Sequence, residues 1–240
     1  MNSVLTIARR EFSAALRSIS TYIIFTIFLV ICGILFAMTV FKIGKAELRF
    51  LFELIHYAYL FYIPAITMGS LAKERSGGTL ELLMTLPLKT GQIIAGKFTA
   101  AVLMLLTVIL CTLVFYGIVW WFGYGIDYGA ILSGYLGIVM AGAAYIAIGI
   151  FASSIQSDQV LAFILAFVIS AFFCLITILL PLLPVPLASV FQYISFGYHL
   201  ESFYKGVLDS RDIIWFLSIS IGFLLMAEFN LKMKNRAQER

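Results

Sequence analysis

The sequence predicts an all-α integral membrane protein with six transmembrane helices, forming one domain over residues 1–240. Three observations support this fold class. Hydrophobic residues make up 62% of the 240 residues and charged residues only 12%, whereas soluble domains carry about 25% charged residues. The mean hydropathy is +1.06. The apolar residues form six long runs with Lys and Arg at their ends, as expected for helices of about 20 residues that cross a hydrocarbon core about 30 Å thick.

The six apolar runs give the expected spans. The first run is too long for the core of a signal peptide, so we expect it to remain as a transmembrane helix. The second run is short, and its helix is predicted to begin near Phe50, with Glu53 and His56 sharing one face at its outer end. Ser157 or Asp158 is expected to cap the fifth helix. The runs cover residues 22–41, 57–72, 98–122, 131–152, 159–180 and 212–230.

Small residues in the fourth run predict close helix packing. Ser133, Gly137 and Ala141 recur at four-residue spacing, with Gly134 and Gly142 beside them. Residues without bulky side chains let a partner helix approach the backbone in a membrane. The pattern predicts packing and says little about a substrate.

Cysteine and histidine usage argues against metal chemistry. Cys32, Cys111 and Cys174 each lie inside an apolar run and are interpreted as packing residues, because their spacing fits neither a disulfide framework nor a zinc site. His56 and His199 are both placed at the outside, with no second ligand nearby. No Ser-His pairing or carboxylate dyad falls within the spans, which argues against a membrane-embedded enzyme. The net charge of +4 reflects topology, so nucleic-acid binding is not expected.

Two features set the expected topology. The residues before the first run place Arg10 and Arg17 opposite Leu5 and Phe12, as in an amphipathic helix lying in the membrane interface; a frayed basic N-terminus is the alternative. The larger share of Lys and Arg lies on the side that holds both termini and residues 73–97. By the positive-inside rule this side is cytoplasmic, in a bacterial inner membrane.

The segment 73–97, KERSGGTLELLMTLPLKTGQIIAGK, is the most informative part of the chain. Gly77 and Gly78 break the helix that leaves the membrane, Thr79 can cap a new one, and a leucine-rich stretch follows until Pro87 ends it. A short apolar helix beside the bilayer needs a surface to bury its leucines. It can dock on a protein partner or lie on the lipid surface, and the composition favours neither.

The stretch GQIIAGKFT in the same segment comes within one residue of the phosphate-binding P-loop pattern. Phe98 stands where a Ser or Thr would bind Mg²⁺, and a transmembrane run follows instead of a soluble α/β domain. We therefore expect no nucleotide binding by this stretch. Lys97 is interpreted as a basic anchor at the mouth of the third span, and Gly91 and Gly96 as a bend into the membrane.

The segment resembles the cytoplasmic loop of ABC-2 type permeases, the transmembrane subunits of ATP-binding cassette transporters. In that family the loop forms a coupling helix that fits a cleft on a separate ATPase subunit, which binds ATP and Mg²⁺ itself. The resemblance implies no cofactor on this chain. The implied coupling contacts are Glu74, Arg75, Gly78, Thr79, Leu80, Glu81 and Leu83, with Pro87 ending the helix.

The resemblance extends over nearly the whole chain. The stretches FASSIQS before the fifth run and VLDSRDI before the sixth are most similar to gliding-motility-type (GldF-like) permeases, and a second resemblance is to nitrous-oxide-reductase maturation permeases. The family implies that the proline-rich segment between the fifth and sixth runs folds as short re-entrant helices. Its aromatic residues are then predicted to line an outer gate, although interfacial anchoring fits them equally well: Tyr193, Phe196, Tyr198 and Phe203.

The predicted function is that of the permease subunit of an ATP-driven exporter. The resemblance implies two copies of the ATPase and a second permease, identical or related, together with contacts to membrane lipid and an envelope partner. The alternative is an ion-driven secondary transporter, which needs ionisable groups near the midplane. Against it, Asp158, Asp212 and Glu228 lie at the ends of spans. The sequence does not select a substrate.

Overall fold

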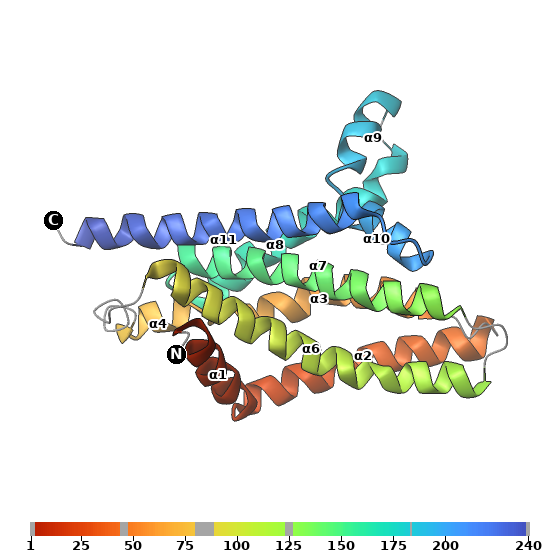
Figure 1. Cartoon of the computed structure of the whole chain (residues 1–240), viewed down its shortest axis with the longest axis horizontal. Coiled ribbons are helices and arrows are strands. Elements are labelled where there is room, and N and C mark those ends of the chain that lie inside the picture. Colours follow the sequence, from red (N-terminus) through yellow and green to blue (C-terminus); the bar gives the residue numbers. More distant parts are fainter. Residues whose placement is uncertain (1–2, 44–47, 80–88, 123–126, 183, 239–240) are drawn as a thin grey trace.

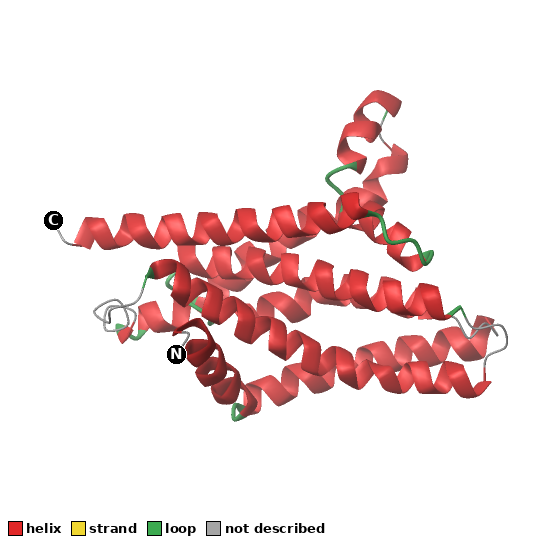
Figure 2. Ribbon diagram, viewed as in Figure 1, coloured by secondary structure: helices red, strands yellow, loops and turns green. Residues whose placement is uncertain are grey.

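The computed structural model describes residues 3–43, 48–79, 89–122, 127–182 and 184–238, and every regular element in these ranges is a helix (Figure 2). The elements are α1 (Ser3–Leu16), α2 (Ile19–Ile43), α3 (Leu48–Thr67), α4 (Ala72–Ser76), α6 (Thr90–Phe122), α7 (Tyr128–Ile155), α8 (Gln159–Leu179), the 3-10 turn η1 (Leu180–Leu182), α9 (Val185–Gln192), α10 (Phe196–Tyr204) and α11 (Ser210–Gln238).

Six helices are long and apolar enough to cross a membrane, which confirms the six predicted spans. The second candidate span includes α4, because α3 and α4 follow one another after a short turn. The fifth span begins where expected, since the Asp158 carboxylate accepts from the amides of Val160 and Leu161. The spans are Ile19–Met38, Leu48–Ser76, Thr90–Trp121, Tyr128–Ile155, Gln159–Leu179 and Ser210–Lys234.

The helix α7 forms the centre of the bundle. Its apolar window is 72% buried, more than that of any other span, and it contacts α3, α6, α8, α10 and α11. Small residues make this possible: Gly134, Gly137 and Gly142 belong to the predicted pattern, and Gly149 was not predicted. A Cβ added at Gly134 would lie 2.1 Å from the Phe52 ring, and one at Gly149 would lie 2.1 Å from Thr67 Oγ1. Two further glycines of α7 meet side chains in the same way: Gly137 (Phe203) and Gly142 (Leu105).

The bundle has two distinct ends (Figure 1). Both chain termini, α1, α4 and the start of α6 lie at one end, which we call the terminal end. The short helices α9 and α10 lie at the opposite end, which we call the hairpin end. The helices that flank the segment predicted to couple to an ATPase, α4 before it and α6 after it, therefore meet this segment at the terminal end.

The helix α6 corrects one prediction. Residues 91–96 do not bend into the membrane, because α6 continues through them without a break. The two glycines serve close approach instead. A Cβ added at Gly96 would lie 2.7 Å from Ile7 of α1, and one at Gly91 would lie 3.1 Å from Glu228 Oε2 of α11.

The start of α3 differs from its predicted arrangement. Glu53 is half-buried and pairs with Arg49 at 3.5 Å, whereas His56 is buried and its Nε2 lies 3.4 Å from Cys174 Sγ. The two polar residues therefore do not share an environment. His56 lies inside the bundle, where its neighbours are aromatic rings of α7 and α10 and a thiol of α8. Cys111, in contrast, is exposed and is not a packing residue.

The proline-rich segment forms short helices, as the family resemblance implies. η1 ends α8, α9 begins directly after Pro184 with Pro186 in its first turn, and α10 follows a turn at Ser195. Proline is tolerated in a first helical turn because its missing amide is not needed there. α9 stands away from the bundle, while α10 packs against α7 and α8.

The glycine contacts of α7 generate a stability prediction. Gly134→Ala forces a Cβ into the buried Phe52 ring, so we expect a loss of about 1–3 kcal/mol from overpacking and a lower melting temperature of the purified protein in detergent. Gly117→Ala in α6 is the control, since no atom lies within 4 Å of an added Cβ there. Equal melting temperatures for the two variants would contradict the packing account.

Candidate functional site

The break between α3 and α4 is held together by a serine of another helix. Ser153 of α7 accepts hydrogen bonds from the amides of Leu71 (2.9 Å) and Ala72 (3.0 Å) and donates to the carbonyl of Met68 (2.9 Å). The residue before α4, Leu71, provides no side-chain cap. Because the first amides of a helix lack partners within it, Ser153 supplies the missing cap and ties α4 to α7.

The C-terminal end of α7 collects two cations from different helices. Arg75 of α4 donates through Nη1 to the carbonyl of Ile155 at 3.2 Å, and Lys234 of α11 donates to the same carbonyl at 2.7 Å. Asn230 of α11 also donates to Ser154 Oγ at 3.2 Å. The last carbonyls of a helix need donors and carry a partial negative charge. The two cations therefore fix α4 and α11 against the end of α7.

A second junction forms around Lys97. Its Nζ lies 2.7 Å from Glu74 Oε1 of α4 and 3.5 Å from Glu11 Oε1 of α1, and its side chain is 3% exposed. The interpretation of Lys97 as a basic anchor at the membrane surface was therefore wrong. Lys97 faces α1 and α4, where two carboxylates compensate for its removal from water. The junction joins α1, α4 and α6.

The predicted coupling residues fall into three groups. Glu74 and Arg75 turn inward, to Lys97 and to the end of α7. Gly78 and Thr79 are exposed; Gly78 has φ +67°, a backbone conformation that favours glycine, and Thr79 Oγ1 donates to the carbonyl of Glu74. The remaining predicted contacts lie outside the described residues: Leu80, Glu81, Leu83 and Pro87.

The near-match to a P-loop has a different structure from a phosphate-binding loop. Residues 91–99 lie inside α6, where the backbone amides belong to a continuous helix. The Thr99 hydroxyl donates to the carbonyl of Ala95. A P-loop instead aims free amides of a loop at phosphate. This stretch therefore has the geometry of a transmembrane helix.

The four aromatic residues predicted for an outer gate are separated by the structure. Phe196 and Phe203 are fully buried, and Phe196 packs between the rings of Tyr145 and Trp215. Tyr193 is 61% exposed and Tyr198 is half-buried. The first two therefore belong to the core, and the last two remain at the surface of the hairpin end.

Sequence reasoning missed a buried Ser, His and Asp cluster at the hairpin end. His199 Nδ1 lies 2.7 Å from Asp212 Oδ1, and Ser202 donates to the other oxygen of Asp212. The serine contacts the carboxylate and not the imidazole, so it lacks the adjacent base that activates a nucleophile. His199 and Ser202 lie three residues apart in an aromatic helix, a spacing that marks a shared polar face.

Comparison with known proteins gives the family. The family model of the ABC-2 family transporter proteins matches residues 54–219, more than half of the chain. The chain belongs to the ABC-2 transporter family. No curated protein matches it. The region shared with ABC-2 transporters runs from α3 into α11 and includes α4 and the end of α7.

Family membership indicates which part of a transporter this ABC-2 protein forms. Proteins of the family are transmembrane, generally non-catalytic components, and membership implies an ABC ATPase as partner. With its six span-length helices, the chain is a multi-pass membrane protein. Among the residues that the structure describes, no three His, Cys, Asp or Glu side chains gather as metal ligands would.

The Lys97 junction generates a second stability prediction. Lys97→Ala leaves the half-buried Glu74 without its cation and leaves Glu11 only its exposed partner Arg10, so we expect a loss of about 2 kcal/mol, measured as a lower melting temperature in detergent. Adding Glu11→Gln and Glu74→Gln to Lys97→Ala is expected to recover part of this loss, because no carboxylate then lacks its cation.

Lys205→Ala provides the matched control for this charge removal. Lys205 pairs with Glu201 at 2.7 Å, but both side chains are about half exposed, and exposed helix pairs contribute only about 0.3–0.5 kcal/mol. If Lys97→Ala were as mild as Lys205→Ala, Lys97 would not hold the three helices together.

Proposed function

We propose that this chain is the permease subunit of an ATP-driven exporter, and that it converts ATP hydrolysis on a separate subunit into movement of its spans. The observation that carries the proposal is the bonding of α4 to α7 through Ser153 and Arg75, and to α1 and α6 through Glu74 and Lys97. α4 leads directly into residues 80–88, the predicted coupling segment. A force on that segment therefore reaches four helices through short polar contacts.

The partner ATPase is proposed to bind ATP and Mg²⁺ and to dock on the coupling segment. Leu80, Glu81 and Leu83 are the proposed contacts, with Pro87 ending the coupling helix. Glu74 Oε2 and Arg75 Nη2 are buried and have no hydrogen-bond partner among the described residues. These two atoms can form hydrogen bonds with the coupling segment or with the docked ATPase, since buried polar groups normally find partners.

The proposed topology places the terminal end in the cytoplasm of a bacterium and the hairpin end outside the inner membrane. The support is the charge distribution: α1 and the turn that follows it expose Arg9, Arg10 and Arg17 at the terminal end, as an interfacial helix does. The segment η1 to α10 is proposed to re-enter from outside. Tyr193 and Tyr198, whose rings pack edge to face at 5.7 Å, are the proposed outer gate.

The proposed assembly contains two permeases, identical or related, and two ATPase subunits. The stretches FASSIQS and VLDSRDI support a relation to gliding-motility-type (GldF-like) permeases. The first stretch contains the Ser153 cap and the second contains Asp212, so both carry structural contacts. Membrane lipid and an envelope partner complete the proposed set of partners.

Charge reversal on the coupling segment tests ATPase docking. We expect Glu81→Lys to lower recovery of the complex when the chain is co-purified with the ABC ATPase of its own operon. A close interfacial charge pair contributes about 1.5 kcal/mol or more, which corresponds to roughly a tenfold weaker complex. The insertion and yield of the permease itself are expected to stay unchanged.

Glu201→Lys is the control for this docking experiment. Glu201 is an exposed carboxylate at the hairpin end, where the ATPase is not proposed to bind. Normal recovery of the complex with Glu81→Lys, or an equal loss with Glu201→Lys, would contradict docking at residues 80–88.

A further inference from the structure

The hairpin end contains a buried imidazole with two hydrogen-bond partners. His199 of α10 is 4% exposed, its Nδ1 lies 2.7 Å from Asp212 Oδ1, and its Nε2 lies 3.0 Å from the carbonyl oxygen of Tyr193. The ring stacks on Trp215, with centroids 4.2 Å apart. Tyr193 directly follows α9, so the imidazole connects the end of α9 to α10 and α11.

The two contacts of His199 fix the number of protons in the cluster. A carbonyl oxygen only accepts hydrogen bonds, so Nε2 must carry a proton to bond to Tyr193. The 2.7 Å contact between Nδ1 and Asp212 also needs a proton, because two lone pairs would repel at that distance. The cluster therefore holds either an imidazolium beside a carboxylate or a neutral imidazole beside a protonated Asp212. Both descriptions contain the same two protons.

We propose that the proton shared by His199 and Asp212 clamps the end of α9 to the bundle, and that its loss at alkaline pH releases α9. A neutral imidazole beside an ionised Asp212 has one N–H and can keep only one of the two contacts. The contact to a charged acceptor is the stronger one. The remaining proton therefore moves to Nδ1, and the bond to the Tyr193 carbonyl is lost.

The groups around the cluster leave Asp212 as its charged partner among the described residues. The ring of Tyr198 packs edge to face against the imidazole, with centroids 5.3 Å apart, and the ring of Tyr193 packs against that of Tyr198. Of the other charged groups between α10 and α11, Glu201 and Lys205 pair with each other and are exposed, Arg211 is exposed, and the half-buried Asp209 accepts from the amide of Arg211. On α3, the half-buried Glu53 pairs with Arg49.

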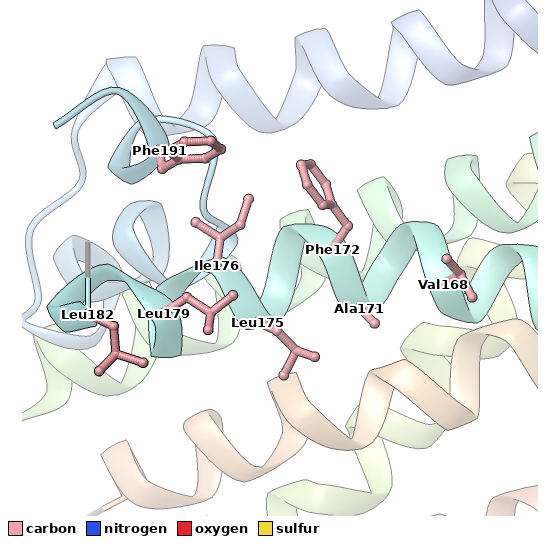
Figure 3. A pocket seen from close by; sticks show the side chains of 8 residues that line it. All are labelled: Val168, Ala171, Phe172, Leu175, Ile176, Leu179, Leu182 and Phe191. Carbon is pink, nitrogen blue, oxygen red and sulfur yellow. The ribbon is translucent and has the colours of Figure 1, made fainter. Parts of the chain in front are cut away.

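Release of α9 has a structural consequence at the neighbouring groove. Phe191, two residues before Tyr193, projects from α9 toward a groove of about 400 Å³ along α8 (Figure 3). All of the residues that line the groove are apolar, among them Phe172, Ile176 and Leu179 of α8. The clamp on Tyr193 therefore also sets the position of Phe191 over this apolar surface.

Nitrogen-15 magnetic resonance of the purified protein tests the proton count directly. The chain has two histidines, and a His56→Gln variant assigns the remaining signal to His199. Across a scan from about pH 5 to about pH 10, we expect Nε2 to be protonated at the acidic end. At the alkaline end we expect a neutral ring protonated at Nδ1. An Nε2 proton that persists throughout the scan, or a ring with no change of state, would overturn the proposal.

The position of α9 is measured by distances between two spin labels. Val190 of α9 and Leu217 of α11 are 60% and 47% exposed, and Cys111→Ser removes the exposed native thiol. We expect one narrow Val190Cys–Leu217Cys distance distribution at acidic pH and a second, longer distance at alkaline pH. An unchanged distribution while His199 titrates would refute the clamp.

Asp212→Asn tests the role of the proton shared by His199 and Asp212 while it keeps a side chain of the same size. Its amide can donate to Nδ1 while Nε2 keeps its proton and its bond to Tyr193, so we expect α9 to stay in place at alkaline pH. Asp209→Asn, directly before α11, is the control and is expected to respond to pH as the unmodified chain does. Release of α9 by Asp212→Asn at every pH, or loss of the pH response with Asp209→Asn, would overturn the assignment.

Discussion

The hydrogen bonds at the C-terminal end of α7 are the constraint on which the rest of the structure depends. α7 is the most buried span, and the last carbonyls of a helix have no partner within the helix and need donors from elsewhere. Arg75 and Lys234 supply donors to the carbonyl of Ile155, and two residues earlier Ser153 caps α4. These requirements fix α4 and α11 against the central helix.

The two ends of the bundle use different chemistry to hold their peripheral helices. At the terminal end the donors are Arg75, Lys97 and Lys234, which contact carbonyls or carboxylates. Such contacts suit a junction that transmits force while it stays closed. At the hairpin end the imidazole of His199 contacts the carbonyl that ends α9, and we propose that this contact depends on the proton shared with Asp212. In this proposal the contact at the hairpin end opens by loss of a proton, whereas the terminal junction responds to a force on α4.

Sequence reasoning predicted the features that depend on local pattern. Hydropathy gave the six spans, small residues gave the packing face of α7, and Asp158 gave the cap of α8. It failed where the partner is distant in sequence: Arg75 and its acceptor Ile155 are 80 positions apart, so Arg75 was interpreted as a contact to the ATPase and its contact to α7 was missed. Phe196 and Phe203 were misplaced because apolar rings suit a gate and a core equally. Residues 80–88 lie outside the described structure, so the coupling helix stays a prediction.

The most direct test of this account measures whether α4, α7 and α11 move as one unit when the partner ATPase binds ATP. Spin labels at Ser76 of α4 and Met233 of α11, both exposed, report the distance across the end of α7. The account predicts the same narrow distance with and without ATP, and a broad distance that responds to ATP after Arg75→Ala. A change of the Ser76–Met233 distance on ATP binding in the unmodified junction would contradict it.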